Sequence, residues 1–307
     1  MTVIVRDARP EDLPRVVEVR RAVLPFLVET PESLHAQVRN APAARRHRLL
    51  VAERDGEVVG ASHAGIAHDS PEPGRAFASP MVHPAHRGRG AGGLLLRVAE
   101  DHLAAEGAAV LHAWVLDQPE HRAFAERRGY RRGRSSRFQR LDLAGADLPE
   151  PPEELPPGVA LGTTADFAAD PRPLFEADAE ATADEPSDVP EEFDDYEEWL
   201  RHTWRNPLLD RALSTVAVVD GRVAAFTAAH TDGRGRYLSG MTGTLRAYRG
   251  RGLAKLVKAD SLRRARAAGC TEAFTCNDDG NGPMLAVNSR FGYEPCGAEV
   301  RYGRALG

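Results

Sequence analysis

Two short runs rich in arginine and glycine contain the residues of this sequence that are best suited to chemistry. They read Arg87-Gly88-Arg89-Gly90-Ala91-Gly92 and Arg249-Gly250-Arg251-Gly252-Leu253-Ala254. Glycine lets a backbone approach a ligand without a Cβ clash, and arginine carries charge that matches phosphate oxygens. Where such a run opens a helix, the free N–H groups of the first turn also attract negative charge. Each run therefore predicts an anion site, and a diphosphate suits it best.

The segments around each run indicate elements that place it between a strand and a helix. In the first half we expect strands at 3–6, 48–54, 57–67, 76–82 and 109–115, with helices at 10–28, 91–106 and 119–128. In the second half we expect strands at 214–219, 222–230, 238–244 and 272–276, with helices at 253–268 and 283–291. Asp55-Gly56 and Asp220-Gly221 are strong hairpin signals. The pattern predicts an α/β protein of the α+β kind, with helices on the faces of a mixed sheet.

The order of these elements repeats, so the chain is expected to contain two copies of one domain. A segment between the copies contains five prolines, four acidic residues and no aromatic residue, which is typical of a linker. The predicted organisation is a domain at 1–143, a linker at 144–157 and a second domain at 158–307.

The two runs resemble the acetyl-CoA signature Gln/Arg-x-x-Gly-x-Gly/Ala of the GCN5-related N-acetyltransferases, the GNAT family. The matching residues are Arg87, Gly90 and Gly92 in the first copy and Arg249, Gly252 and Ala254 in the second. Strand and helix order fits twice, so the resemblance covers nearly the whole chain, and its layout is distantly similar to that of tandem members such as mycothiol synthase. No Gly-x-Gly-x-x-Gly or Gly-Lys-Ser/Thr motif supports a dinucleotide or P-loop site instead.

The resemblance implies that acetyl-CoA is the acyl donor and that the loop amides hold its pyrophosphate. In the family, the strand before the loop, here ending near Val82 and Thr244, separates from the next strand so that pantetheine can pair with its backbone. Gly240 and Gly243 suit a bulged strand in the second copy.

The family often follows its fifth strand with Asn-x-x-(Ala/Met)-x-x-x-Tyr-x-x-x-Gly-Phe, in which the tyrosine protonates the leaving thiolate. The second copy matches at Asn281, Met284, Gly292 and Tyr293 but has Asn288 at the tyrosine position. The first copy is further from the pattern, since it has Gln118, His121, Ala125, Gly129 and Tyr130. The resemblance therefore favours the second copy as catalytic and implies a cofactor contact for Asn281.

The residues that the family often uses as catalytic acid and base are missing from the matching positions. Neither copy has the glutamate that the family often carries on its fourth strand. Asn288 could bond the thioester or the sulfur, or it could pack on a helix face. Tyr237 could take the proton of the amine, although packing on a sheet face is the simpler role.

Residues 176–198 contain twelve acidic residues and no basic one. In the family this region covers the acceptor cleft, so it favours a cationic amine as acceptor; a solvated helix face is the alternative. Aromatic residues follow at helical spacing and indicate a buried stripe: Phe193, Tyr196, Trp199 and Trp204.

Composition narrows the other possibilities. The halves have net charges of +4 and −5, which argues against nucleic acid as a partner. No apolar run is long enough for a membrane span, and no export signal opens the chain. The cysteines, Cys270, Cys276 and Cys296, lack metal-type spacing and are expected to be free thiols in the cytoplasm. No metal is implied, and the protein could be a monomer, with the copies as an internal pseudo-dimer, or a homodimer.

The sequence thus predicts an N-acetyltransferase that moves an acetyl or related acyl group from acetyl-CoA to a small, cationic amine. Two alternatives stay open. One is a non-catalytic, regulatory acyl-CoA-binding protein on the same scaffold, which the missing glutamate and tyrosine favour. The other is a protein N-acetyltransferase, which would need an open acceptor groove.

Overall fold

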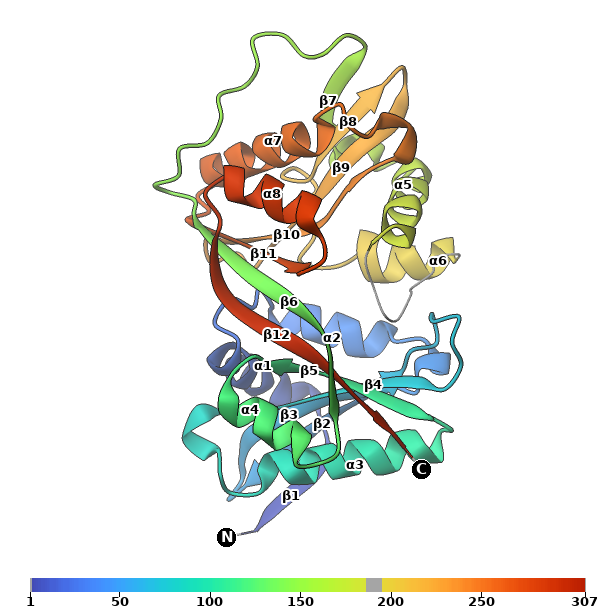
Figure 1. Ribbon diagram of the computed structural model, residues 1–307, viewed down its shortest axis with the longest axis vertical. Helices are drawn as coiled ribbons and strands as arrows, with labels where there is room; N and C mark the ends of the chain where they lie inside the picture. The colour runs from blue at the N-terminus through green and yellow to red at the C-terminus, as the bar shows by residue number, and fades with distance from the viewer. Residues whose placement is uncertain (1, 186–194, 307) are drawn as a thin grey trace. The chain divides into compact units, whose positions relative to one another are not determined.

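The computed structural model describes residues 2–185 and 195–306 (Figure 1). Contacts divide the chain into an N-terminal unit, 1–135 together with 297–307, and a C-terminal unit, 136–296. Each unit is a sheet with helices on both faces, as the alternation of strand and helix patterns predicts.

The sheet of the N-terminal unit has the strand order β1-β2-β3-β4-β5-β12. Neighbouring strands are antiparallel except β4 and β5, which are parallel. Helices α1 and α2 cover one face and α3 and α4 cover the other. The strands are β1 (Val3–Asp7), β2 (Arg48–Arg54), β3 (Glu57–Ile66), β4 (Arg75–Val82), β5 (Val110–Leu116) and β12 (Glu294–Ala305). The helices are α1 (Leu13–Val23), α2 (Pro31–Asn40), α3 (Ala91–Ala105) and α4 (Pro119–Glu126), with 3-10 turns at Pro10–Asp12, Ala43–Arg45 and Pro84–His86.

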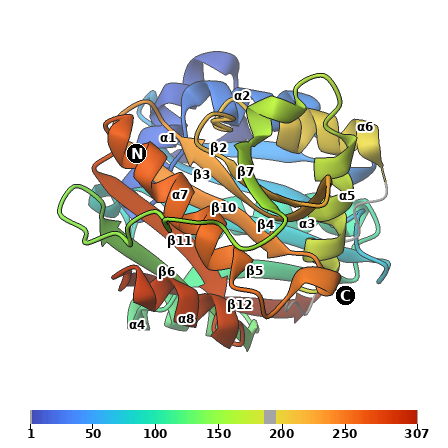
Figure 2. The same ribbon diagram turned by 90° about the horizontal axis from the view of Figure 1, so that it is seen from above.

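The C-terminal unit repeats this arrangement with the strand order β6-β11-β10-β9-β8-β7. Here β10 and β11 are the parallel pair. Helices α7 and α8 pack on one face, and α5 and α6 pack on the other (Figures 1 and 2). The strands are β6 (Arg131–Asp142), β7 (Val159–Thr163), β8 (Thr215–Val219), β9 (Arg222–Thr231), β10 (Arg236–Thr244) and β11 (Glu272–Asp278). The helices are α5 (Arg172–Ala183), α6 (Tyr196–Trp199), α7 (Leu253–Ala267) and α8 (Gly282–Arg290), with a π-helical turn at Leu200–Trp204 and 3-10 turns at Thr164–Phe167 and Arg246–Tyr248.

Local sequence signals account for the ends of several elements. The predicted hairpins form with positive φ at both turn residues, 54° and 81° at Asp55-Gly56 and 49° and 79° at Asp220-Gly221. The helix expected at 10–28 is shorter: α1 ends at Val23, just before Pro25, because proline cannot continue a helix. Trp199 and Trp204 are buried against Phe226, which confirms the aromatic stripe for these positions, while Phe193 lies outside the described residues.

The last strand of each sheet could not be predicted from local patterns. In the N-terminal unit, β12 from the end of the chain pairs antiparallel with β5. In the C-terminal unit, β6 pairs antiparallel with β11. The domain boundaries predicted at 143 and 158 follow the sequence repeat. The contacts differ from them, because they assign residues 136–143 to the C-terminal unit and residues 297–307 to the N-terminal unit.

Candidate functional site

A split between two parallel strands forms the centre of the candidate site. In the C-terminal unit, β10 and β11 pair only from Arg236 with Glu272 to Leu238 with Phe274. Beyond Leu238 the two strands continue without pairing. The register between β10 and β9 also shifts between Ser239 and Thr242, which marks a bulge. The backbone of β10 is therefore irregular where the split opens.

The second glycine-arginine loop lies at the far end of β10 and opens α7. Gly250 and Gly252 have φ values of 75° and 77°, a left-handed conformation that favours glycine. Gly252 is the N-cap of α7, and no side chain caps it. The N–H groups of a helix's first turn have no intrahelical partner. The loop thus offers backbone donors and the positive end of a 15-residue helix to an anion.

A pocket of about 740 Å³ joins the split, the bulge and the loop. Among the predicted cofactor residues of the second copy, those that line it are Thr244, Arg249, Gly250, Gly252, Leu253, Ala254 and Asn281. Arg251 is not in the lining and lies over the Tyr248 ring at 5.8 Å. Asn281 caps α8, where its side chain accepts a hydrogen bond from the backbone N of Met284 over 3.3 Å.

The first arginine of each loop fixes the loop to the end of the preceding strand. Arg249 Nε donates to the carbonyl of Thr244 over 3.1 Å, and Arg87 Nε donates to the carbonyl of Val82 over 3.3 Å. Arg249 also donates to Asp184, which binds Arg246 as well. These hydrogen bonds lower the pKa of the Asp184 carboxyl to about 2.

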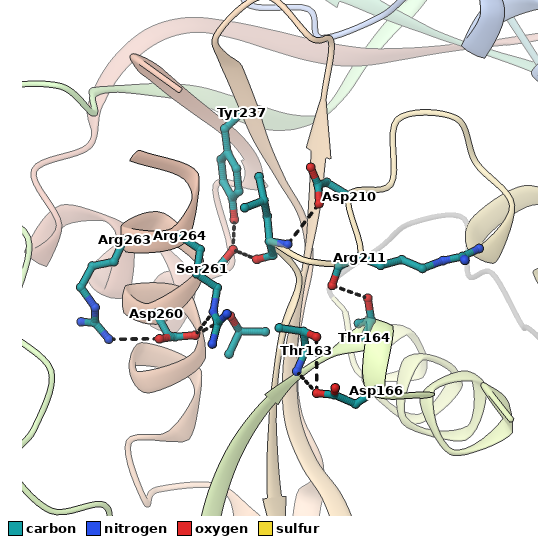
Figure 3. A network of polar contacts seen from close by, with 12 residues as sticks. Thr163, Thr164, Asp166, Asp210, Arg211, Tyr237, Asp260, Ser261, Arg263 and Arg264 are labelled. Atoms are coloured by element: carbon teal, nitrogen blue, oxygen red, sulfur yellow. Dashed lines mark hydrogen bonds and ion pairs between the residues drawn. The ribbon is translucent and has the colours of Figure 1, made fainter. Parts of the chain in front are cut away.

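Tyr237 lies in the core and does not line the pocket. Its side chain is fully buried, and its hydroxyl lies 2.8 Å from Ser261 Oγ (Figure 3). Ser261 donates to the carbonyl of Leu213 over 2.6 Å, so Tyr237 is the donor to Ser261. Burial raises the pKa of Tyr237. Of the two roles considered for Tyr237, packing on a face of the sheet is the one that matches these surroundings.

Asn288 is also buried outside the pocket lining, where it binds a buried lysine. Lys258 Nζ donates to Asn288 Oδ1 over 2.5 Å, and both side chains are fully buried. Asn288 Nδ2 donates to Gln139 Oε1 over 3.0 Å and to Asn277 Oδ1 over 2.7 Å. Asn277 does line the pocket, so this network connects the buried lysine to the pocket wall.

Two carboxylates, Asp184 and Glu185, are among the described residues that line the pocket. Asp184 is bound by arginines, whereas the pKa of Glu185 is raised by desolvation and by the nearby charge of Asp278. The Glu185 side chain is also exposed, so an acceptor amine can reach it. Glu185 lies just beyond α5, within the acidic segment 176–198 that the family resemblance puts over an acceptor cleft, and residues 186–194 of that segment lie outside the described residues.

A histidine lies beside the bulge on the α5 face of the sheet. A Cβ at Gly240 would come 3.0 Å from His230 Cε1 and 3.1 Å from its Nδ1. Burial lowers the pKa of His230 to about 4, so the imidazole is neutral at pH 7. On the same strand, a Cβ at Gly243 would come 2.6 Å from the Ala181 Cβ. Glycines thus let α5 and His230 approach β10 closely.

The N-terminal unit has an equivalent glycine-arginine loop, which follows strand β4. Gly88 and Gly90 have φ values of 73° and 92°, and Gly90 caps α3 without a side-chain partner. Ala91 is the buried first residue of that helix, and a Cβ on Gly92 would be directed toward Val82 and Phe124. Arg89, which lies between Gly88 and Gly90, is the remaining residue predicted to contact the cofactor in this loop.

The strand before this loop has no bulge. Strand β4 pairs with β3 without a register shift, from Val82 with Gly60 to Ala76 with Ile66. It also contains Pro80, which has no N–H to offer a ligand. Equivalent residues of the two copies are 161 positions apart before the bulge, as in Arg75 and Arg236, and 162 apart after it, as in Arg87 and Arg249. The bulge in β10 is therefore one extra residue.

Several residues of this site were not singled out from the sequence, among them Asp184, Glu185, Lys258 and Asn277. Lys258 is one of only two lysines and lies between apolar residues on the buried side of α7, which is the one signal that could have marked it. The others line the pocket through the packing of α5 and the split between the strands. No helix in the described part of the chain combines the length and apolar character needed to cross a membrane.

The chain is similar to known proteins over most of its length. The sequence model of the Acetyltransferase (GNAT) family matches residues 16–130 and 175–293. A mycothiol acetyltransferase of Amycolatopsis mediterranei is 31% identical over 264 residues, which cover 83% of each chain. A mycothiol acetyltransferase of Nocardia farcinica is 31% identical over 279 residues, covering 85% of this chain and 83% of the relative.

Solved structures share the fold over the whole chain at lower identity. A tandem GNAT protein from the clavulanic acid biosynthesis pathway has a TM-score of 0.74 at 22% identity and covers 100% of this chain and 99% of its own. A GCN5-related N-acetyltransferase from Sphaerobacter thermophilus has a TM-score of 0.71 at 22% identity, with 99% and 96% covered.

Proposed function

Because the chain belongs to the acetyltransferase (GNAT) family, we propose that it transfers an acetyl group from acetyl-CoA to the amine of a small, cationic acceptor in the pocket of the C-terminal unit. One observation carries this proposal: the split between β10 and β11, the bulge in β10 and the Gly250–Gly252 loop all border a single pocket of about 740 Å³. Acetyltransferases of this fold use acetyl-CoA as donor, and these three features suit its reacting end, its arm and its pyrophosphate.

The residues present fit a long, anionic donor. The uncapped first turn of α7 and the two left-handed glycines supply N–H groups for a diphosphate. The unpaired backbone of β10 beyond Leu238 offers hydrogen bonds to an extended arm. When bound, acetyl-CoA would supply the activated acyl group as a thioester. Backbone N–H groups beside the bulge are suited to hold the carbonyl oxygen as negative charge develops on it.

Glu185 is our candidate for the general base. It is one of the two carboxylates among the described lining residues, and the other, Asp184, is occupied by Arg246 and Arg249. A raised pKa makes a carboxylate a better proton acceptor near neutral pH. The charges of Glu185 and Asp278 also favour a cationic acceptor.

The relatives' names support a small molecule as acceptor over a protein. Two of them are mycothiol acetyltransferases at 31% identity, so the unacetylated form of mycothiol is the first acceptor to test. Relatives at 31% identity can differ in their acceptors, so the panel of amines to be tested also includes polyamines, amino sugars and a basic peptide. Acetylation of the peptide alone would favour the protein acetyltransferase alternative.

The test combines calorimetric titration of acetyl-CoA with a CoA-release assay on wild type, Gly252→Glu and Gly90→Glu. The two variants are matched, since both glycines cap equivalent helices with positive φ. Gly252→Glu places a carboxylate at the diphosphate site and should abolish turnover, whereas Gly90→Glu should leave activity measurable. Turnover that survives Gly252→Glu but not Gly90→Glu would place catalysis in the N-terminal unit. Binding without release of CoA to any amine would favour a regulatory acyl-CoA-binding protein.

A further inference from the structure

The C-terminal unit contains a fully buried lysine, which is a rare environment for a charged side chain. Lys258 on α7 is fully buried, and its Nζ lies 2.5 Å from Asn288 Oδ1 on α8 and 5.0 Å from the Tyr293 ring centre. Burial of an ammonium group is costly unless the group is hydrogen-bonded. Desolvation accordingly lowers the pKa of Lys258 to about 7. Such a group is expected to determine the arrangement of the polar atoms around it.

Lys258 fixes the direction of a chain of amide hydrogen bonds. The charged form of Lys258 has only donors, so in that form the Asn288 atom that faces it is the oxygen, as the hydrogen bond from Nζ to Oδ1 has it. Asn288 Nδ2 then faces the other way and donates to Gln139 Oε1 and to Asn277 Oδ1. The orientation of a side-chain amide is often ambiguous, but here the lysine at the end of the chain determines it. Asn277 therefore commits its oxygen to the interior.

The amide nitrogen of Asn277 is left as a donor on a residue that lines the pocket. Leu238 and Phe274 form the last pair between β10 and β11, so Asn277, three residues further along β11, lies on the unpaired part of that strand. Asn277 and Met241 both line the pocket. Met241 belongs to the bulge in β10 and Asn277 belongs to β11, so the two residues line the pocket from the two strands that separate.

We propose that Asn277 Nδ2 donates a hydrogen bond to the acyl carbonyl oxygen from the β11 side of the split, and that Lys258, acting through Asn288, is the positioning residue that fixes this donor. The inference rests on the proposed function, which puts the reacting end of the donor at the bulge. Asn288 stands at the position of the missing family tyrosine. In this proposal it does not contact the substrate itself but orients Asn277, which does.

Asn277→Asp is the decisive variant. The new carboxylate still accepts from Asn288 Nδ2, so the buried network and the fold keep their contacts, while the N–H donor is lost. We expect kcat to fall about 100-fold to 1000-fold, as for the loss of one donor to a developing oxyanion. The KM for acetyl-CoA and the thermal midpoint should stay close to wild type. Asn40→Asp in the N-terminal unit is the control for an added carboxylate.

Asn288→Asp tests the positioning step separately. Its carboxylate keeps a partner for Lys258 but removes the donor to Asn277, whose amide is then free to turn. A fall in kcat similar to that of Asn277→Asp, with unchanged KM for acetyl-CoA, is the expected result. An unchanged kcat in Asn277→Asp, with or without a lower thermal midpoint, would overturn the inference and leave the network a purely structural one.

The failure of this inference can be told apart from that of the proposed function. Wild type that neither binds acetyl-CoA nor releases CoA would overturn the proposed function, and the inference with it. Wild type that is active, together with an equally active Asn277→Asp, would overturn the inference alone.

Discussion

Arg249 donates a hydrogen bond from Nη2 to Asp184 Oδ2 over 2.5 Å, joining residues 65 positions apart in the sequence. Asp184 lies directly after α5, and Arg249 opens the loop that caps α7. The Asp184 carboxyl, with its pKa lowered to about 2, is charged at any working pH. It therefore cancels positive charge at the place where the proposed function puts a diphosphate.

Asp184→Asn should tighten the binding of acetyl-CoA. The amide keeps an oxygen for a guanidinium but removes a negative charge beside the diphosphate. We expect the Kd to fall about fivefold at low salt, and the difference to shrink as salt screens the charges. Calorimetry at two salt concentrations measures it, with Asp279→Asn, a carboxylate bound to Arg137 over 3.1 Å, as control. Weaker binding would show that Asp184 holds Arg249 in its binding position instead.

Lys258 should make stability rise with pH above neutrality. Its pKa is about 7 in the folded chain and 10.5 as the ordinary value, so between these limits the unfolded chain binds more protons. Unfolding then takes up a proton, and raising the pH stabilises the folded state by up to about 1.4 kcal/mol per pH unit.

Thermal melts of wild type and Lys258→Met from about pH 6 to pH 9 test this linkage. The difference between the two curves isolates Lys258 from groups such as Cys270, whose raised pKa acts in the opposite direction. Lys255→Met on the same helix is the control. Parallel curves for wild type and Lys258→Met would contradict the expectation.

Glu185→Gln should reduce turnover strongly. Loss of a general base lowers kcat by about 100-fold to 10,000-fold, and the acid limb of the wild-type pH–rate profile should lie above the usual pKa of a glutamate. Steady-state kinetics of CoA release against pH measures both effects. Glu176→Gln, an exposed residue on α5, is the control. A profile that keeps its acid limb in Glu185→Gln would assign the base elsewhere, with the neutral imidazole of His230 as the next residue to test.

Tyr237→Phe should affect stability more than catalysis. The change removes the hydrogen bond to Ser261 in the core and is expected to cost about 1 kcal/mol. Because Tyr237 does not line the pocket, kcat should stay within about threefold of wild type. Denaturant unfolding and steady-state kinetics on one preparation compare the two effects. A large fall in kcat at unchanged stability would restore Tyr237 as the candidate base.

The sequence predicted the features that depend on neighbours along the chain. The two loops between strand and helix and the hairpins at Asp55-Gly56 and Asp220-Gly221 form as expected, and the loop glycines adopt positive φ. The family match confirms the tandem GNAT arrangement and the mixed α/β fold that the repeat indicated. The extra residue in the second copy is also present in the sequence, although only the register of β10 shows that it forms a bulge.

The roles of single residues across the pocket could not be predicted in this way. Asn288 matched a family position, but its partners Lys258 and Gln139 lie 30 and 149 residues away. Glu185 belonged to an acidic run in which no single carboxylate stood out, and the packing of α5 beside β10 distinguishes it. Tyr237 shared its strand with pocket residues, and only its burial against Ser261 separates it from them.

The strands, helices and two copies could be predicted from the sequence, because backbone preferences and hydrophobic periodicity act over a few residues, and the residues of the two glycine-arginine loops carried the resemblance to the family. Only the packed structure shows which strands complete each sheet and which carboxylates and asparagines line the pocket. Those features depend on contacts between segments far apart in the chain, such as β12 with β5 and Lys258 with Asn288. Packing of the whole unit fixes these contacts, and no local pattern encodes them.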